Sequence, residues 1–155
     1  MASRRTLRPF ALLACGVLSA LVSAGIAGAA DFRSIGDRPA ILYDAPAAKA
    51  TKVGILGGSQ PVEVVVKLDK WSKVRDFSGE LAWVENSALA DRRLVVVGAS
   101  NAEVRTQPRA AAPPAFEARR GVVLELTGVP VDGFAPVRHR DGSTGFVAIG
   151  QLWGL

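Results

Sequence analysis

The sequence predicts an all-β protein built of two small β-barrels in tandem after a short export segment. Three observations favour this fold class. No window of the 155 residues carries a long apolar pattern with the period of a helix. Apolar residues instead form short runs, often alternating with polar ones and bounded by Gly, Pro, Asp and Ser, a pattern typical of strands and turns. The second half of the chain then repeats the first at an offset of about 62 residues, which indicates repeated structural units.

The first thirty residues have the layout of a secretory signal peptide. Arg4, Arg5 and Arg8 give a positive start, residues 10–26 are uncharged and apolar, and small residues follow at 27–30. Cleavage after this segment predicts a periplasmic or secreted protein. The alternative is an uncleaved anchor, because the apolar run is close to the minimum length for a membrane span. The paired arginines leave both general and twin-arginine export open.

Removing residues 1–30 changes the charge balance. The whole chain has 19 Lys and Arg against 14 Asp and Glu. Three of the basic residues lie in the signal segment, so residues 31–155 carry a net charge of about +2. This near balance argues against a nucleic-acid partner. Cys15 is the only cysteine, so the exported part is expected to have neither disulfide nor thiol chemistry.

The first half reads as a series of short strands. Residues 31–39 are polar, with Gly, Asp and Pro, and are expected to form an irregular lead-in. The clearest strand is expected over residues 62–67, with valines 62, 64 and 66 on one face and Glu63 and Lys67 on the other. The other expected elements are strands at 41–43 and 52–56, a hairpin over 71–84 that turns at Gly79, a single 3₁₀ turn within 85–89, and a strand at 93–97.

The second half repeats this plan with one residue inserted between 127 and 133. The matched pairs are Val62 and Leu124, Glu63 and Glu125, Trp71 and Phe134, Arg75 and Arg138, Gly79 and Gly142, and Trp83 and Phe146. The repeat predicts two domains, residues 31–92 and 93–155. Because units of this size bury little surface, the apolar run 94–97 is expected to pack between or into them.

The same residues resemble bacterial SH3 (Src-homology-3-like) domains. The similarity begins with an opening strand and proline loop at 43–46 and a Trp-x-Lys-Val segment at 71–74. It continues with a turn at Gly79, an aromatic-Val segment at 83–84 and a closing Leu89. Each of these has a counterpart in the second half. The exported part as a whole resembles a proteobacterial subfamily of exported proteins with two such domains. Three departures are clear: Ala82 and Ser59 stand where the family has Gly, and Phe replaces both Trp in the second repeat.

No pattern for catalysis, metal binding or a cofactor is found. The exported part has one histidine, His139, between Arg138 and Arg140 on an expected hairpin tip, and no nucleophile motif accompanies it. Clustered ligands at metal-binding spacing do not occur. We therefore expect a non-enzymatic protein without metal or cofactor.

Strand alternation and the resemblance together predict a ligand-binding site. Val74 is expected to face the core, so Trp71 shares the outer face of its strand with Lys73 and Arg75. Val84 is likewise expected to face the core, so Trp83 lies on the outer face of its strand. Tyr43 lies in a segment that resembles the groove-lining aromatic motif of SH3 domains. We expect Tyr43, Trp71 and Trp83, with Arg75 beside them, to line a shallow groove for an extended peptide or a glycan-linked peptide. The alternative is that these rings cover a barrel end or an interface.

The resemblance implies an exported, non-catalytic binding or targeting protein of the cell envelope. The expected partner is a cell-wall peptide or an envelope protein, and contact with a membrane is expected only through an uncleaved signal segment. Two alternatives remain open. One is a structural or assembly protein with its aromatic residues buried in an interface, and the other is an accessory subunit of a cell-wall hydrolase.

Overall fold

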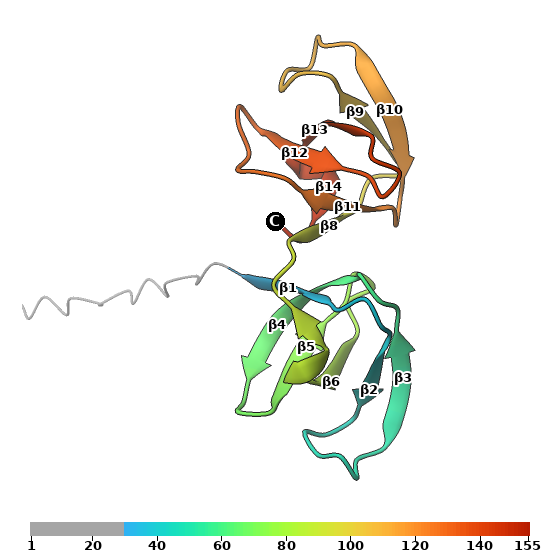
Figure 1. Cartoon of the computed structure of the whole chain (residues 1–155), viewed down its shortest axis with the longest axis vertical. Helices are drawn as coiled ribbons and strands as arrows, with labels where there is room; N and C mark the ends of the chain where they lie inside the picture. Colours follow the sequence, from blue (N-terminus) through green and yellow to red (C-terminus); the bar gives the residue numbers. More distant parts are fainter. Residues whose placement is uncertain (1–29) are drawn as a thin grey trace, which may run out of the picture.

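The computed structural model describes residues 30–155. The predicted signal peptide, apart from Ala30, lies outside the described residues. Within them the chain forms strands and two short 3₁₀ turns that build two antiparallel sheets, one per half (Figure 1). This confirms the all-β fold class, and the architecture fits an SH3-like fold. No helix in the described part is long and apolar enough to cross a membrane.

The first sheet has the strand order β3-β2-β6-β5-β4-β1-β7. Its elements are β1 (Asp31–Ile35), β2 (Ala40–Tyr43), β3 (Lys52–Leu56), β4 (Pro61–Lys67), β5 (Trp71–Arg75), β6 (Leu81–Glu85), the 3₁₀ turn η1 (Asn86–Ala88) and β7 (Leu89–Ala90). The core of this half is small and aliphatic, and it is centred on Ile35, Ala40, Val62, Val74 and Val84.

The second sheet repeats this order as β10-β9-β13-β12-β11-β8-β14. Its elements are β8 (Leu94–Val97), β9 (Asn101–Arg105), β10 (Pro114–Arg119), β11 (Val123–Leu126), β12 (Phe134–Arg138), β13 (Thr144–Ala148), η2 (Ile149–Gln151) and β14 (Leu152–Trp153). Each strand of the second half therefore has a counterpart in the first, with β8 in the place of β1. We call the two halves the first and the second repeat.

Strand β1 corrects the prediction of an irregular lead-in. Residues 31–35 pair with β4 on one side and with β7 on the other. Ser34 and Ile35 are fully buried, and the Ser34 hydroxyl donates a hydrogen bond to the carbonyl oxygen of Ala90 at 3.3 Å. A polar residue with a hydrogen-bond partner is tolerated in a core, which is why the polar composition of this segment was misleading.

The alternation along β4 breaks at a β-bulge. Val62 is buried and Val64 pairs with Val74, but the pairing with β5 shifts register between Val64 and Val66. A bulge inserts one extra residue and reverses the faces that follow it. Val66 is consequently 41% exposed, so the prediction that valines 62, 64 and 66 share the core face is wrong for the last of them.

The continuous apolar run 94–97 forms strand β8, which packs against both repeats. All four of its residues are buried. Val95 and Val97 belong to the core of the second repeat, and β4 of the first repeat lies against β8. The expectation that this run packs between or into the two halves agrees with this arrangement.

Candidate functional site

The aromatic residues predicted from the first repeat lie together on one side of its sheet. The rings of Tyr43 and Trp71 meet edge to face with centroids 5.1 Å apart, and Tyr43 is the backbone partner of Trp83. Trp71 and Trp83 are half-buried, whereas Tyr43 is only 7% exposed. We call these three residues the aromatic face. Two half-covered indoles beside a buried phenol can present flat apolar area together with polar edges.

Strand alternation orients the two tryptophans as expected. Ser72 and Val74 of β5 are buried, so Trp71 and Lys73 point to the opposite face. On β6 the neighbours of Trp83 are buried in the same way. The Lys73 backbone pairs with that of Trp83, which brings the outer side chains of both strands to one surface.

A polar network around the buried Ser72 fixes the start of β5 and thus the position of Trp71. The Ser72 hydroxyl donates to Asn86 Oδ1 at 2.7 Å. Asn86 Nδ2 in turn donates to the carbonyl oxygens of Leu68 and Asp69 at 2.9 and 3.0 Å. Because these bonds tie η1 to the β4–β5 turn, Trp71 is held by residues on both sides of it. The matching positions in the second repeat are Ala135 and Ile149, which lack these side-chain groups.

Arg75 shares the outer face of β5 but has a partner within the protein. Its guanidinium lies 3.0 Å from the carboxylate of Glu63, the residue opposite it on β4. In the second repeat Arg138 and Glu125 make the same cross-strand pair at 2.9 Å. This recurrence indicates that the arginine supports the sheet, and a ligand would compete with Glu63 for it.

An open groove of about 640 Å³ adjoins the aromatic face, between the β2–β3 hairpin and β6. It forms because β2 and β6 pair only at Tyr43 and Trp83 and diverge beyond that point. Trp71 and Arg75 do not line it. The lining residues are Leu42, Tyr43, Asp44, Val53, Gly54, Ile55, Leu56, Lys73, Val74, Asp76, Glu80, Leu81, Ala82 and Trp83.

Several residues of this groove were not predicted as site residues. Val53 and Ile55 on β3 are 56% and 74% exposed, and Leu81 is 48% exposed. One signal was present in the sequence: Val53, Ile55 and Leu56 make β3 apolar on both faces, although one face of an edge strand usually meets water. The divergence of β2 from β6, which opens the groove, leaves no such local trace.

The second repeat lacks an equivalent aromatic face. Arg105 stands in the place of Tyr43 and pairs with Phe146. Its guanidinium donates to the carbonyl oxygen of Ala112 at 2.7 Å and also binds the Glu103 carboxylate. Phe134 replaces Trp71, so neither the phenol nor the indole N–H groups recur. Any shared ligand of the two repeats would thus meet different chemistry.

The only histidine of the described residues lies on a turn outside the aromatic face. His139 Nδ1 is 3.0 Å from a carboxylate oxygen of Asp141. The pKa of Asp141 is lowered from its ordinary value of 3.8 to about 2, first because the backbone N–H of Ser143 donates to it and second because of His139. Over residues 30–155 no group of three or more potential metal ligands comes together.

Comparison with known proteins gives a family match over part of the chain and a set of similar solved structures, among them two from Trichomonas vaginalis. A search of curated proteins found no match. NlpC2 from Trichomonas vaginalis is 15% identical with a TM-score of 0.38, covering 81% of this chain and 48% of that one. NlpC1 from the same organism is 17% identical with a TM-score of 0.39, covering 88% and 50%. The chain thus spans about half the length of each structure. Residues 36–91, which hold β2 to β7 and the whole aromatic face, match the family model of the bacterial SH3 domain.

Proposed function

We propose that this protein is an exported, non-catalytic binding protein of the cell envelope, periplasmic or secreted, that recognises a cell-wall peptide or a protein partner through its first repeat. The observation that carries the proposal is that Tyr43 and Trp83 line an open groove, with Trp71 packed edge to face against Tyr43. Its position within the bacterial SH3 match at residues 36–91 supports a binding or targeting role. The signal-like pattern of residues 1–30 supports export.

The shape and chemistry of the groove favour an extended peptide. Its walls are strands β2, β3 and β6, and its lining combines apolar side chains with one cation, Lys73, and three acidic residues. Two of these carboxylates already bind the backbone: Asp44 accepts from Thr51 N, and Asp76 accepts from Ser78 N and Glu80 N. Glu80 is therefore the carboxylate best placed for a cationic group on the ligand.

A binding experiment with purified peptidoglycan sacculi tests this proposal. The chain from Asp31 onward is mixed with sacculi and sedimented, as wild type and as Trp83→Ala and Trp71→Ala variants. We expect wild type to sediment with the sacculi. Each variant should lose most of this retention, because stacking on an indole contributes an appreciable part of the affinity of such sites.

Phe134→Ala provides the matched control, because Phe134 occupies the position of Trp71 in the second repeat. It should sediment like wild type. Retention lost equally in this variant would locate the site outside the aromatic face and overturn that part of the proposal. A wild-type protein that stays in solution would exclude the cell-wall ligand and leave a protein partner. Circular dichroism of each variant verifies that the fold is intact.

A second candidate function, an assembly protein that associates with its own copies, is favoured by exposed apolar side chains of the β2–β3 hairpin, two of which also line the groove. Ile41 and Ile55 are opposite each other in the register, and Val53 lies at the register shift of the same hairpin. All three are exposed, and β3, which carries Val53 and Ile55, is an edge strand of the sheet; edges of this kind pair readily with other chains. Sedimentation velocity of wild type and Ile55→Lys tests it: a dimer that the lysine dissociates supports assembly, and a monomer at all concentrations excludes it.

A further inference from the structure

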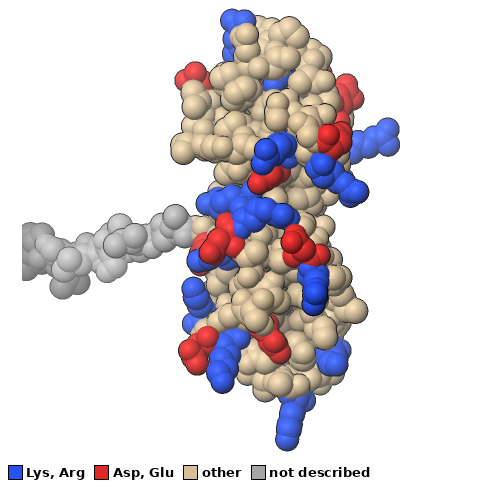
Figure 2. All heavy atoms as spheres, in the orientation of Figure 1, with Lys and Arg blue, Asp and Glu red and all other residues tan. Residues whose placement is uncertain are grey.

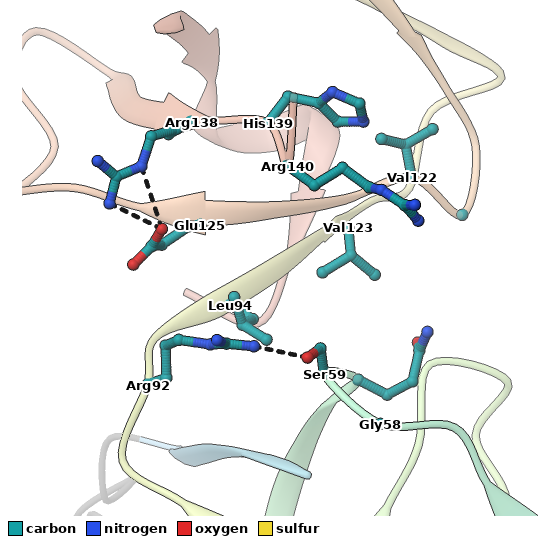
Figure 3. A pocket seen from close by; sticks show the side chains of 12 residues that line it. Gly58, Ser59, Arg92, Leu94, Val122, Val123, Glu125, Arg138, His139 and Arg140 are labelled. Atoms are coloured by element: carbon teal, nitrogen blue, oxygen red, sulfur yellow. Dashed lines mark hydrogen bonds and ion pairs between the residues drawn. The ribbon is translucent and has the colours of Figure 1, made fainter. Parts of the chain in front are cut away.

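A second cavity, of about 630 Å³, lies where the two repeats meet, and we call it the waist cleft. Four segments surround it: the β3–β4 loop of the first repeat, the linker at Arg92, the start of β11, and the β12–β13 turn (Figure 3). Its volume is within the range of roughly 300–1,000 Å³ that is typical of ligand pockets. The lining residues are Gly58, Ser59, Gln60, Arg92, Leu94, Gly121, Val122, Val123, Glu125, Arg138, His139 and Arg140.

The charge of the waist cleft is positive. Three arginines line it against a single acidic residue, Glu125, and that carboxylate is already paired with Arg138. Arg92 reaches Asp37 at 3.5 Å, a carboxylate that is itself exposed and outside the lining. Within residues 30–155 no carboxylate lies within ion-pair distance of Arg140, which points toward the cleft in Figure 3. Figure 2 shows Lys and Arg side chains at this waist, with Asp and Glu side chains beside them.

Ser59 forms part of the wall that the first repeat contributes to the cleft. Ser59 has φ = 59°, a left-handed conformation that non-glycine residues rarely adopt. The equivalent turn of the second repeat has a glycine, Gly121, with φ = 85°. In this conformation the Ser59 hydroxyl accepts a hydrogen bond from the Arg92 guanidinium at 2.5 Å. The serine thus orients one of the three arginines of the cleft.

The lining also contains an apolar part. In Figure 3, Leu94 and Val123 lie between Arg92 and Arg140, and Val122 lies beside the Arg140 guanidinium. A ligand that fills this space therefore needs anionic groups joined by an apolar stem. Guanidinium groups bind carboxylates through paired, charge-assisted hydrogen bonds. A short acidic peptide, with carboxylates at the ends of methylene chains, has both features.

We propose that the waist cleft binds a carboxylate-bearing peptide, with Arg140 and Arg92 as its anion contacts. This site is separate from the aromatic face, because none of its lining residues belongs to the groove of the first repeat. It gives the paired repeats a function that neither has alone, since the cleft takes residues from both.

Isothermal titration calorimetry with a triglutamate peptide tests the proposal, with trilysine and inorganic phosphate as comparison probes. We expect wild type to bind triglutamate, more weakly at high salt, and not trilysine. Arg140→Gln should weaken binding by about tenfold, the usual effect of losing a hydrogen bond between charged groups. Arg109→Gln is the matched control, because Arg109 is an exposed arginine in the β9–β10 loop, outside the cleft lining. It should change the affinity by less than about twofold.

Each other outcome overturns the proposal. Absence of triglutamate binding excludes the site. An equal loss of affinity in Arg140→Gln and Arg109→Gln would show that the peptide is attracted only by the net charge of the protein. Phosphate bound as tightly as triglutamate would show an anion site that does not select a peptide. The Trp71→Ala protein separates this inference from the proposed function: it should bind triglutamate like wild type, while Arg140→Gln should still sediment with sacculi.

Discussion

At the scale of single residues, two adjacent glycines meet different surroundings. A Cβ added at Gly58 would lie 2.3 Å from the backbone oxygen of Asp37, whereas one at Gly57 would meet only Gln60 Cγ at 3.8 Å. We expect Gly58→Ala to lower the free energy of unfolding by about 2 kcal/mol, because backbone must move to admit the methyl group. Gly57→Ala should change it by less than about 0.5 kcal/mol. Urea unfolding of both variants measures the difference, and equal midpoints would contradict the close packing of this loop.

Asp141 gives a second prediction at this scale, which concerns pH. Its pKa is lowered to about 2 by the hydrogen bond from the Ser143 backbone and by His139. A carboxyl group with a lowered pKa stabilises the folded state above its unfolded pKa, and this contribution is lost as the pH falls through the folded value. The ¹³C NMR shift of this carboxyl should therefore titrate near pH 2 in the native protein. His139→Gln should raise the midpoint only in part, since the larger contribution comes from the backbone. A native midpoint near 3.8 would show that the turn does not hold the carboxylate.

At the scale of elements, the bulge in β4 separates two valines that the sequence makes look equivalent. Val62 is fully buried, and Val66, beyond the bulge, is 41% exposed. We expect Val62→Ala to lower the free energy of unfolding by about 2 kcal/mol, because it leaves a cavity in the core. Val66→Ala should cost less than about 0.5 kcal/mol. Chemical denaturation of the two variants is the measurement, and similar costs would mean that the alternation continues without a bulge.

Those features that depend on local pattern were predictable from the sequence. The hairpin of β5 and β6 and the outward positions of Trp71 and Trp83 follow from alternating residues around a Gly turn, and Gly79 has the expected positive φ of 92°. Strand β1 was missed because its partners, β4 and β7, lie much later in the chain. Its stability depends on those distant contacts and is not visible in its own composition.

The candidate sites show the same difference between features set by local pattern and features set by tertiary packing. The contact between Tyr43 and Trp71 was expected only through the resemblance to SH3 domains, since alternation within one strand says nothing about a ring on another. The groove depends on how far β2 diverges from β6, and the waist cleft depends on how the two repeats pack. The turn at 138–142 was predicted to be a solvated hairpin tip, and the structure indeed exposes Arg138 and Arg140 but also makes them part of the cleft lining.

At the scale of the whole molecule, one aromatic residue near the end of the chain joins the two repeats. Trp153 of β14 meets Phe32 of β1 edge to face at 5.1 Å, and its ring lies 5.9 Å from that of Phe77. Arg120 of the second repeat covers the Phe77 ring at 5.0 Å, a cation–π contact. Each of the two small cores buries little surface on its own, and this aromatic cluster adds a third packed region between them. The cluster lies at the same junction of the repeats as the waist cleft.

This joint predicts that Trp153→Ala loosens the arrangement of the repeats without unfolding either sheet. Loss of the two aromatic contacts and of partly buried area should lower the free energy of unfolding by about 2 kcal/mol. The radius of gyration from small-angle X-ray scattering should increase, because Trp153 makes the ring contacts with Phe32 and Phe77 that join the halves. Trp71→Ala removes the same side chain far from the joint and should leave the radius unchanged. If the waist cleft needs both repeats in place, Trp153→Ala must also weaken triglutamate binding although it removes no lining residue. An unchanged radius together with unchanged binding would show that β8 and the linker hold the repeats without Trp153.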